Sequence, residues 1–292
     1  MAHLEMMSTM ETELVGKQTS VTIARANPTV IIGERINPTG RKRLAAELVA
    51  GNIGYVKREA MRQVEQGADV IDVNVGAAGV DEVALLPMAV LAVAEVVDVP
   101  ISIDTANPVA LEAALKVCPG RPLVNSVNGE DRSLSAILPL VAQYKVPVIG
   151  LLMDDEGIPA TAERRLEVAR KIIARAKSLG IAPADIVFDC LALTVSTSHE
   201  AALITLDTIR RVVAEIGSNV VLGSSNVSFG LPDRGMINSA FVTLAIAAGM
   251  TATISNPEHM KQPVLATDLV LGKDEWAMRY ITYFRSKPKP SE

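Results

Sequence analysis

Short runs rich in valine and isoleucine recur along the whole chain and alternate with longer amphipathic stretches. This alternation restricts the fold more than any other feature, because it is typical of strand–helix units of roughly 20–40 residues that build parallel sheets. No break in composition divides the eight runs. They predict one α/β domain in which eight units close into a (β/α)8 TIM barrel. The expected strands are Thr29–Gly33, Val70–Val73, Ile101–Ile103, Pro122–Val124, Val148–Leu151, Ile186–Phe188, Val220–Leu222 and Ala252–Ile254.

The stretches between these runs carry helix signals. Tyr55–Gln66 is amphipathic and stops at Gly67, and glycine commonly ends helices because it adopts a positive φ without strain. Asn107 precedes Pro108, so an amide side chain is available to cap a helix whose first residue is proline. We therefore expect helices to cross back between successive strands.

The domain organisation follows from the position of the first run. We assign residues 28–292 to the barrel and residues 1–27 to an N-terminal extension, which we expect to be partly mobile and which does not resemble a signal peptide. Val21–Ala26 is expected to add a small strand beneath the barrel. The uncharged stretch Met236–Pro257 is rich in Ala, Thr, Ser and Asn, and it predicts a buried helix followed by a strand rather than a membrane span.

The composition argues against several functions. The chain has 292 residues, of which 49% are apolar and only 3% aromatic, which favours a barrel core of small branched side chains over stacking platforms for bases. A net charge of −5 argues against a nucleic-acid partner. Two cysteines, Cys118 and Cys190, favour a reduced cytoplasmic location. Three histidines without a neighbouring ligand cluster predict no metal site.

Nearly every predicted strand finishes in a carboxylate or an amide. In a barrel these ends meet on the carboxyl-terminal face, where active sites are built. Capping of the following helix is the alternative, and it stays open for Asn74. It does not account for Asp104, Asn125, Asp189 or Asn226, because the next helix begins later or already has a cap. The strand-end residues are Glu34 with Asn37, Asp72 with Asn74, Asp104, Asn125, Asp154, Asp189, Asn226 and Asn256.

A mouth lined by carboxylates and amides suits a flat heterocycle that carries N–H donors, since a carboxylate accepts two parallel hydrogen bonds from an amino-pyrimidinone edge. No predicted strand ends in lysine, which argues against a Schiff-base aldolase. The turn Gly223-Ser224-Ser225 leaves a second class open, a phosphate-handling lyase or isomerase, although no paired basic residue stands beside it in the sequence.

Several motifs at the strand ends occur together and in order: Ile31-Ile32-Gly33-Glu34-Arg35-Ile36-Asn37, Asp72-Val73-Asn74-Val75-Gly76, Ser102-Ile103-Asp104-Thr105 with Asn107, Val124-Asn125-Ser126-Val127-Asn128, Phe188-Asp189, and Leu222-Gly223-Ser224-Ser225-Asn226-Val227-Ser228. Together they resemble the methyltetrahydrofolate:corrinoid protein methyltransferases. These are pterin-binding barrels related to dihydropteroate synthase and to the folate domain of cobalamin-dependent methionine synthase. The resemblance covers nearly the whole chain from Thr29 onward.

The resemblance implies roles for the matching positions. Asp104, Asn125 and Asp189 would hydrogen-bond the pterin ring, Asp72 and Asn74 would support the pocket floor, and Asn226 would reach N5 of tetrahydrofolate or 5-methyltetrahydrofolate. An asparagine can donate or accept there, so it stabilises developing charge without being a strong acid.

The resemblance also implies partners. The cobalamin-type corrinoid would arrive on a separate protein, and the chain would form a homodimer. The segment Ala252–Glu258 lacks the lysine and Ser-x-Arg element of dihydropteroate synthases, which disfavours that activity. Methyl transfer from a methylated corrinoid protein to tetrahydrofolate, as in demethylation, is slightly preferred over the reverse. A non-catalytic pterin-binding subunit remains an alternative.

Overall fold

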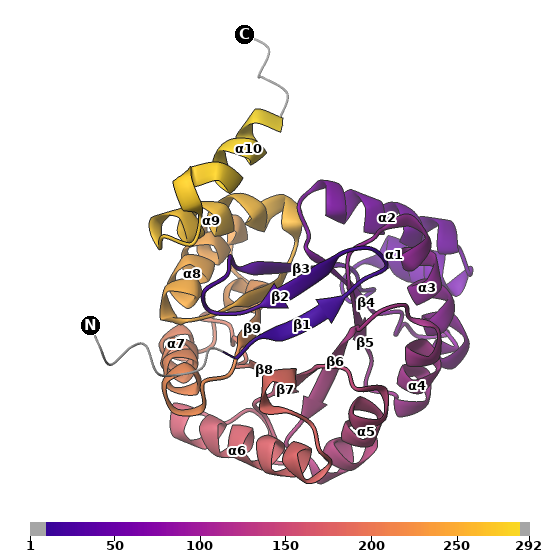
Figure 1. The fold of residues 1–292 in the computed structure, drawn as a ribbon, viewed down its shortest axis with the longest axis horizontal. Helices are drawn as coiled ribbons and strands as arrows, with labels where there is room; N and C mark the ends of the chain where they lie inside the picture. The colour runs from indigo at the N-terminus through magenta and orange to yellow at the C-terminus, as the bar shows by residue number, and fades with distance from the viewer. Residues whose placement is uncertain (1–9, 287–292) are drawn as a thin grey trace.

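Eight parallel strands close into a barrel in the computed structural model, which describes residues 10–286 (Figure 1). Each strand pairs with its neighbours in chain order, and the last strand, β10, pairs with the first, β3. The predicted single (β/α)8 barrel is thereby confirmed. The barrel strands are β3 (Val30–Ile36), β4 (Val70–Val73), β5 (Ile101–Asp104), β6 (Leu123–Asn128), β7 (Val148–Leu151), β8 (Ile186–Asp189), β9 (Val220–Gly223) and β10 (Ala252–Ser255).

Two strands run three or four residues further towards the carboxyl-terminal face than the sequence predicts, whereas the others end within one residue of the expected position. β3 continues to Ile36 and β6 continues to Asn128. In both, the pairing register with the next strand shifts, between Gly33 and Ile36 in β3 and between Asn125 and Val127 in β6. Such irregularities insert residues that a hydrophobic pattern does not reveal, and they occur preferentially near active sites.

An outer ring of helices covers the barrel (Figure 1). Asn107 caps α4 as predicted, because its side-chain oxygen accepts hydrogen bonds from the backbone N–H groups of Val109 and Ala110 at 3.0 and 3.4 Å. No helix within residues 10–286 is both long and apolar enough to cross a membrane. The helices are α1 (Lys42–Val49), α2 (Ile53–Glu65), α3 (Glu82–Val96), α4 (Pro108–Val117), α5 (Asp131–Tyr144), α6 (Ala162–Ser178), α7 (Ala201–Arg211), α8 (Arg234–Ala248), α9 (Pro257–Val270) and α10 (Met278–Ser286).

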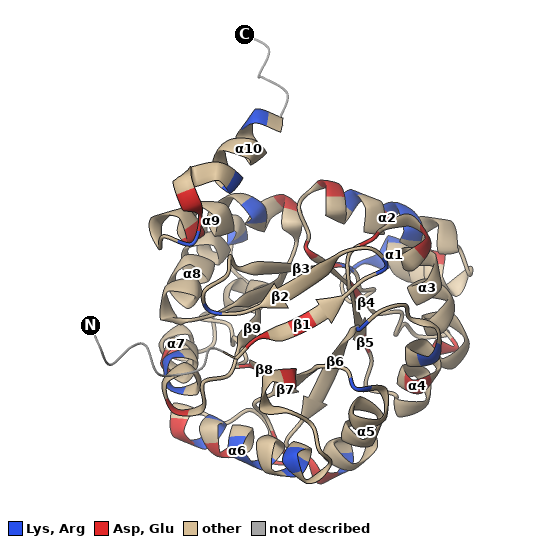
Figure 2. Cartoon of the chain, viewed as in Figure 1, with Lys and Arg blue, Asp and Glu red and all other residues tan. Residues whose placement is uncertain are grey.

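The charged side chains of both signs lie mainly on this outer ring, where Figure 2 shows them interspersed. The strands between them are largely uncharged in the same view, because alternate residues of each strand face either the helices or the barrel interior. Ile31, Ile71 and Val124 belong to the core between strands and helices, whereas Val30 and Ile32 belong to a second core inside the barrel.

A β-hairpin closes the amino-terminal end of the barrel. It consists of β1 (Thr12–Val15) and β2 (Ser20–Ile23), which pair antiparallel and cross in front of the barrel in Figure 1. Leu14 and Ile23 are fully buried and join the core inside the barrel. The sequence predicted the second strand but not the first. The division after residue 27 stays a prediction, and residues 1–9 of the expected extension lie outside the described residues.

Asn219 fastens this hairpin to the barrel. Its side-chain nitrogen donates to the carbonyl oxygens of Met10 and Ile23 and to the hydroxyl of Thr12, at 3.1, 2.8 and 3.0 Å. Because a buried amide that loses its partners is costly, these bonds hold both strands of the hairpin in one place.

Candidate active site

A polar layer lies above the apolar core inside the barrel, and strand geometry dictates its position. Residues two apart on a strand face the same side. A residue two positions after an inward-facing valine or leucine therefore also faces inward. Asp72 follows Val70 in this way, and Asp189 follows Val187. These residues occupy the carboxyl ends of the strands, where barrel active sites form.

Asp72 is the centre of a first cluster, on the neighbouring strands β4, β5 and β6. Its carboxyl group is 1% exposed and accepts hydrogen bonds from Ser102 Oγ at 2.6 Å and from Asn125 Nδ2 at 3.2 Å. The sheet register places Ser102 opposite Asp72 and Asn125 opposite Asp104, so all four side chains share one side of the barrel mouth. The sequence predicted Asp72 and Asn125 at this face but did not predict a role for Ser102.

Asp104 completes the first cluster. It accepts a hydrogen bond from Asn37 Nδ2 at 3.4 Å and makes side-chain hydrogen bonds with Asn74 and Asp72. Burial raises the pKa of Asp104 to about 6. Burial and the neighbouring Asp104 charge raise the pKa of Asp72 well above its ordinary value. Asn74 has two functions, because its oxygen also accepts the Gly76 N–H at 2.8 Å.

Asp189 anchors a second cluster on the other side of the mouth. Its two oxygens accept hydrogen bonds from the backbone N–H groups of Leu191 at 2.7 Å and Gly223 at 3.4 Å. Burial raises the pKa of Asp189 to about 6, although both hydrogen bonds and the nearby Arg165 favour the charged form. Within residues 10–286 no hydrogen bond joins Asp189 directly to the Asp72 cluster.

Asn226 extends this second cluster towards solvent. It lies in a short 3-10 helix, η3 (Ser224–Ser228), that follows β9 directly. The residue is exposed, and its side chain makes no hydrogen bond to another described residue. Its amide nitrogen lies close above Gly223, where a Cβ would stand 3.5 Å away. The structure therefore presents an uncommitted amide next to Gly223, the residue whose N–H donates to the buried Asp189.

Arg234 fixes the helix that carries Asn226. From the start of α8, its guanidinium donates to the Ser225 carbonyl oxygen at 2.8 Å and to Ser228 Oγ at 3.0 Å, and it stacks 5.1 Å from the centroid of the Phe229 ring. The sequence missed this contact, because Arg234 follows the η3 segment by several residues and nothing in the pattern shows that the chain folds back.

The turn after β9 is poorly arranged for a phosphate. The Gly223 N–H donates to the Asp189 carboxylate, and the hydroxyl of fully buried Ser224 is hydrogen-bonded to Thr253 at 2.9 Å. A phosphate would have to displace both partners and approach a carboxylate, which like charge opposes. The phosphate-handling alternative thereby loses its main support.

Arg165 is a buried residue that the sequence analysis also missed. It lies on α6, is 1% exposed, and donates to the carbonyl oxygens of Pro159, Cys190 and Leu191 at 2.9, 2.5 and 3.0 Å. These bonds fix the loop that follows Asp189. A signal was present, because Arg165 falls at the three-to-four-residue spacing of the buried face of α6.

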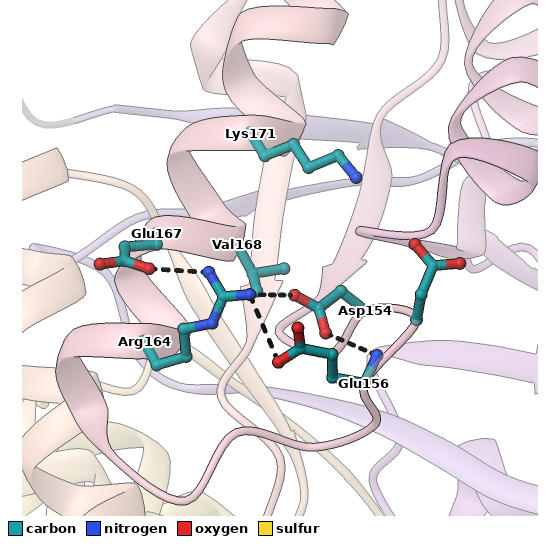
Figure 3. A pocket seen from close by; sticks show the side chains of 7 residues that line it. Asp154, Glu156, Arg164, Glu167, Val168 and Lys171 are labelled. Atoms are coloured by element: carbon teal, nitrogen blue, oxygen red, sulfur yellow. Dashed lines mark hydrogen bonds and ion pairs between the residues drawn. The ribbon is translucent and has the colours of Figure 1, made fainter.

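Asp154 does not join the mouth cluster, although the sequence grouped it with the strand ends. It lines a hollow of about 230 Å³ between the loop after β7 and α6. Figure 3 shows it pointing towards Arg164, with which it forms an ion pair at 3.2 Å. Arg164 also pairs with Glu156 and Glu167, at 3.7 and 2.7 Å. Asp154 lies three residues beyond the end of β7, and its loop turns it outward to α6.

Asn256 does not join the mouth cluster either. It caps α9, because its side-chain oxygen accepts the Glu258 N–H at 3.3 Å. Cys118 and Cys190 are both unbridged, and Cys190 is a buried core residue. In the part of the chain that the structure describes, no group of three His, Cys, Asp or Glu residues could hold a metal ion.

A closed barrel with a ring of acids and amides at its carboxyl end defines a class of proteins that bind flat heterocycles in the barrel mouth. The family model described as "Pterin binding enzyme" matches residues 33–256, which is more than half of the chain, and the chain belongs to this family.

Individual proteins are similar to this chain over most of its length. The chain is 32% identical over 266 residues to a methylcorrinoid:tetrahydrofolate methyltransferase of Eubacterium limosum, covering 88% of this chain and 96% of that protein. It is 30% identical over 285 residues to methionine synthase of Mycobacterium leprae (strain TN), and there it spans about a quarter of the relative, 24%. The fold resembles dihydropteroate synthase of Yersinia pestis, with a TM-score of 0.68 and 17% identity over 91% of this chain and all of that one.

Proposed function

We propose that this protein transfers a methyl group between N5 of tetrahydrofolate and the cobalt of a corrinoid carried by a separate protein. The observation that carries the proposal is the free amide of Asn226 beside Asp189 at the barrel mouth, at the position where the resemblance predicts contact with N5. The name of the Eubacterium limosum relative, of which the chain covers 96%, supports the same reaction.

Asp104, Asn125 and Asp189 supply the groups that a pterin ring needs. The amino-pyrimidinone edge presents N–H donors, and a buried carboxylate is a strong acceptor for them. Asp104 and Asp189 each have a pKa of about 6, so both are mainly ionised at neutral pH and can accept such bonds. Asp72 and Asn74 are proposed to hold Asp104 in place through their hydrogen bonds to it.

The methyl transfer itself is a direct displacement. In the direction towards folate, the N5 lone pair attacks the methyl carbon, the C–N bond forms, the cobalt–carbon bond breaks, and its electron pair stays on cobalt. The N5 proton then leaves to solvent. The Asn226 oxygen can accept from N5–H, and its nitrogen can donate to N5 in the reverse direction, so one side chain stabilises the charge that develops either way. Rate comes mainly from positioning.

We further propose that the usual direction is from methylcorrinoid to tetrahydrofolate, in an anaerobic demethylation of the O-demethylation type, and that the protein acts in the cytoplasm as a homodimer. The name of the Eubacterium limosum relative supports the direction, and the two unbridged cysteines support the cytoplasmic location. Met88 and Leu91 on α3, at 54% and 43% exposure, and Leu244 on α8, at 54%, offer apolar surface for a subunit contact.

The test mixes the protein with methylcob(III)alamin and tetrahydrofolate without oxygen and follows the cobalt spectrum. We expect the methyl-cobalt band to decay only when tetrahydrofolate is present. Asn226→Ala should slow the decay by about 10²–10³-fold, the usual effect of removing one positioned donor. Asn256→Ala is the matched control, because Asn256 is a strand-end amide that only caps a helix.

Tetrahydrofolate binding is titrated in the same samples. Binding without turnover, even when the corrinoid is offered on a carrier protein, would favour the non-catalytic alternative. Failure to bind tetrahydrofolate would refute the pterin site altogether.

A further inference from the structure

Two carboxyl groups, those of buried Asp72 and partly buried Asp104, lie side by side on neighbouring strands at the mouth of this barrel. Ser102, the register partner of Asp72, lies two residues before Asp104 on the same face of β5. Asn125, the register partner of Asp104, donates to Asp72 at 3.2 Å, which brings the two carboxyl groups within reach of a shared hydrogen bond. Asp72 is almost completely buried. A hydrogen bond between two carboxyl groups requires a proton, and two adjacent carboxylates cannot both stay ionised away from water.

No cation neutralises this pair. Among the ion pairs of residues 10–286, none involves Asp72 or Asp104. The other charged groups that act on the pair are acids, Glu34 from β3 and Glu82 from α3. The nearby Arg35 and Arg234 act on Glu34 instead.

A metal ion is not provided for either, since the described residues contain no suitable group of three ligands. The remaining neighbours of the pair are neutral hydrogen-bonding groups: Asn37, Asn74, Asn125 and Ser102. A proton is therefore the positive charge that the site can hold.

The hydrogen bonds indicate which oxygen carries it. Oδ1 of Asp72 accepts from both Ser102, at 2.6 Å, and Asn125, at 3.2 Å, so this oxygen acts as an acceptor. Oδ2 of Asp72 is left for the proton. Oδ2 of Asp104 accepts from Asn37, which favours the anionic form of Asp104.

We propose that Asp72 is a positioning residue that holds one proton at neutral pH and donates it to Asp104, so that Asp104 stays anionic and oriented to accept N–H groups of the pterin ring. That Asp104 binds a pterin ring rests on the proposed function, whereas the proton shared by Asp72 and Asp104 does not. The burial of Asp72, which raises its pKa, is consistent with it.

The inference makes Asp72 replaceable by a neutral group of the same shape. In Asp72→Asn the amide nitrogen can donate to Asp104 while the amide oxygen accepts from Ser102 and Asn125. In Asp72→Leu the volume is kept, but both hydrogen-bonding functions are lost. Asp154→Asn is the control, because it removes an acid that is also at a strand end but is ion-paired with Arg164.

The experiment combines two measurements on the purified full-length variants at about pH 7.5. Infrared difference spectra in H₂O and D₂O detect the C=O stretch of a protonated carboxylic acid, and calorimetric titration gives the Kd for tetrahydrofolate. We expect the acid band in the wild type and in Asp154→Asn, and its loss in Asp72→Asn. Asp72→Asn should bind tetrahydrofolate within about threefold of wild type, and Asp72→Leu at least about tenfold more weakly, the order expected for one lost charge-assisted hydrogen bond.

Two results would overturn the inference: no acid band in the wild type, or an Asp72→Asn variant that binds as weakly as Asp72→Leu while melting like the wild type. The first result does not depend on folate. If the acid band is present and no variant, wild type included, binds tetrahydrofolate, the proposed function fails and the shared proton stands.

Discussion

Replacing Arg165 with methionine should destabilise the barrel strongly, although Arg165 lies in the first turn of a helix whose other side faces solvent. Methionine keeps most of the aliphatic volume and removes the guanidinium group. That group donates to three backbone carbonyl oxygens, those of Pro159, Cys190 and Leu191. In the variant these oxygens remain buried without a donor, at the end of β8 and in the loop before α6.

The expected magnitude follows from these bonds. A hydrogen bond from a charged donor contributes about 1.5–3 kcal/mol, so three bonds give a gross loss of roughly 4.5–9 kcal/mol. Removing the guanidinium also removes the cost of burying its charge. The lowered pKa of Arg165 reflects this cost, because burial disfavours the charged form. The net loss should be about 3–5 kcal/mol, the range found when a buried charged network loses one member. At about 2–4 °C per kcal/mol, the melting temperature should fall by roughly 6–20 °C.

Arg164→Met is the matched control, because the two arginines are adjacent. Arg164 keeps 44% of its side chain exposed, and its ion pairs lie on the flank of the barrel. Such pairs contribute up to about 1 kcal/mol. Urea unfolding and thermal melting of both variants test the prediction. Equal small losses in the two variants would show that the carbonyl oxygens find other donors and that Arg165 does not hold the Asp189 loop.

Three further predictions concern separate parts of the molecule. Burial raises the pKa of Asp189 from its ordinary 3.8 to about 6, so the folded state holds this proton more tightly, and the resulting stability is complete below about pH 4 and lost as pH rises to about 6. The urea midpoint should therefore fall between about pH 4 and pH 6.5 and level off above, with a flatter slope in Asp189→Asn. Arg234→Leu removes the hydrogen bonds that hold the η3 helix, so kcat for methyl transfer should fall about tenfold or more, while the Kd for tetrahydrofolate should change less. Stopped-flow kinetics measures the first quantity and calorimetric titration the second. Asn219→Ala should cost about 1–3 kcal/mol and speed amide hydrogen exchange in residues 12–23, and unchanged exchange would count against its role in the hairpin.

The sequence predicted the barrel and one side of its mouth well, because both follow from strand periodicity. Val70 and Asp72 illustrate this: two residues of one short run face inward together, one into the core and one into the site. The same rule failed for Asp154, whose loop leaves the strand before the aspartate is reached. Alternation holds only as long as the chain is a strand, so predictions weaken with each residue beyond the last apolar position.

Contacts between distant segments were not predictable from the sequence. Arg234 fixes η3 because the chain turns back at the start of α8, and no local pattern encodes that return. Arg165 and Arg164 are neighbours with the same chemistry; helix periodicity separates the buried arginine from the exposed one, but it does not reveal the carbonyl oxygens of Cys190 and Leu191 that Arg165 binds. The register shift in β3, which keeps Glu34 inside the strand, also arises from pairing with β4 and not from the residues of β3 alone.

The hairpin beneath the barrel gives the site a single entrance. Leu14 and Ile23 fill the amino end with apolar side chains, so a ligand can reach the polar layer only from the carboxyl end. In the proposed reaction the folate lies deep in that opening and the corrinoid protein covers it. Under this proposal we expect the two reactants to bind in order, folate first. The methylated folate leaves only after the corrinoid protein has dissociated, and an excess of that protein should slow turnover by trapping the product.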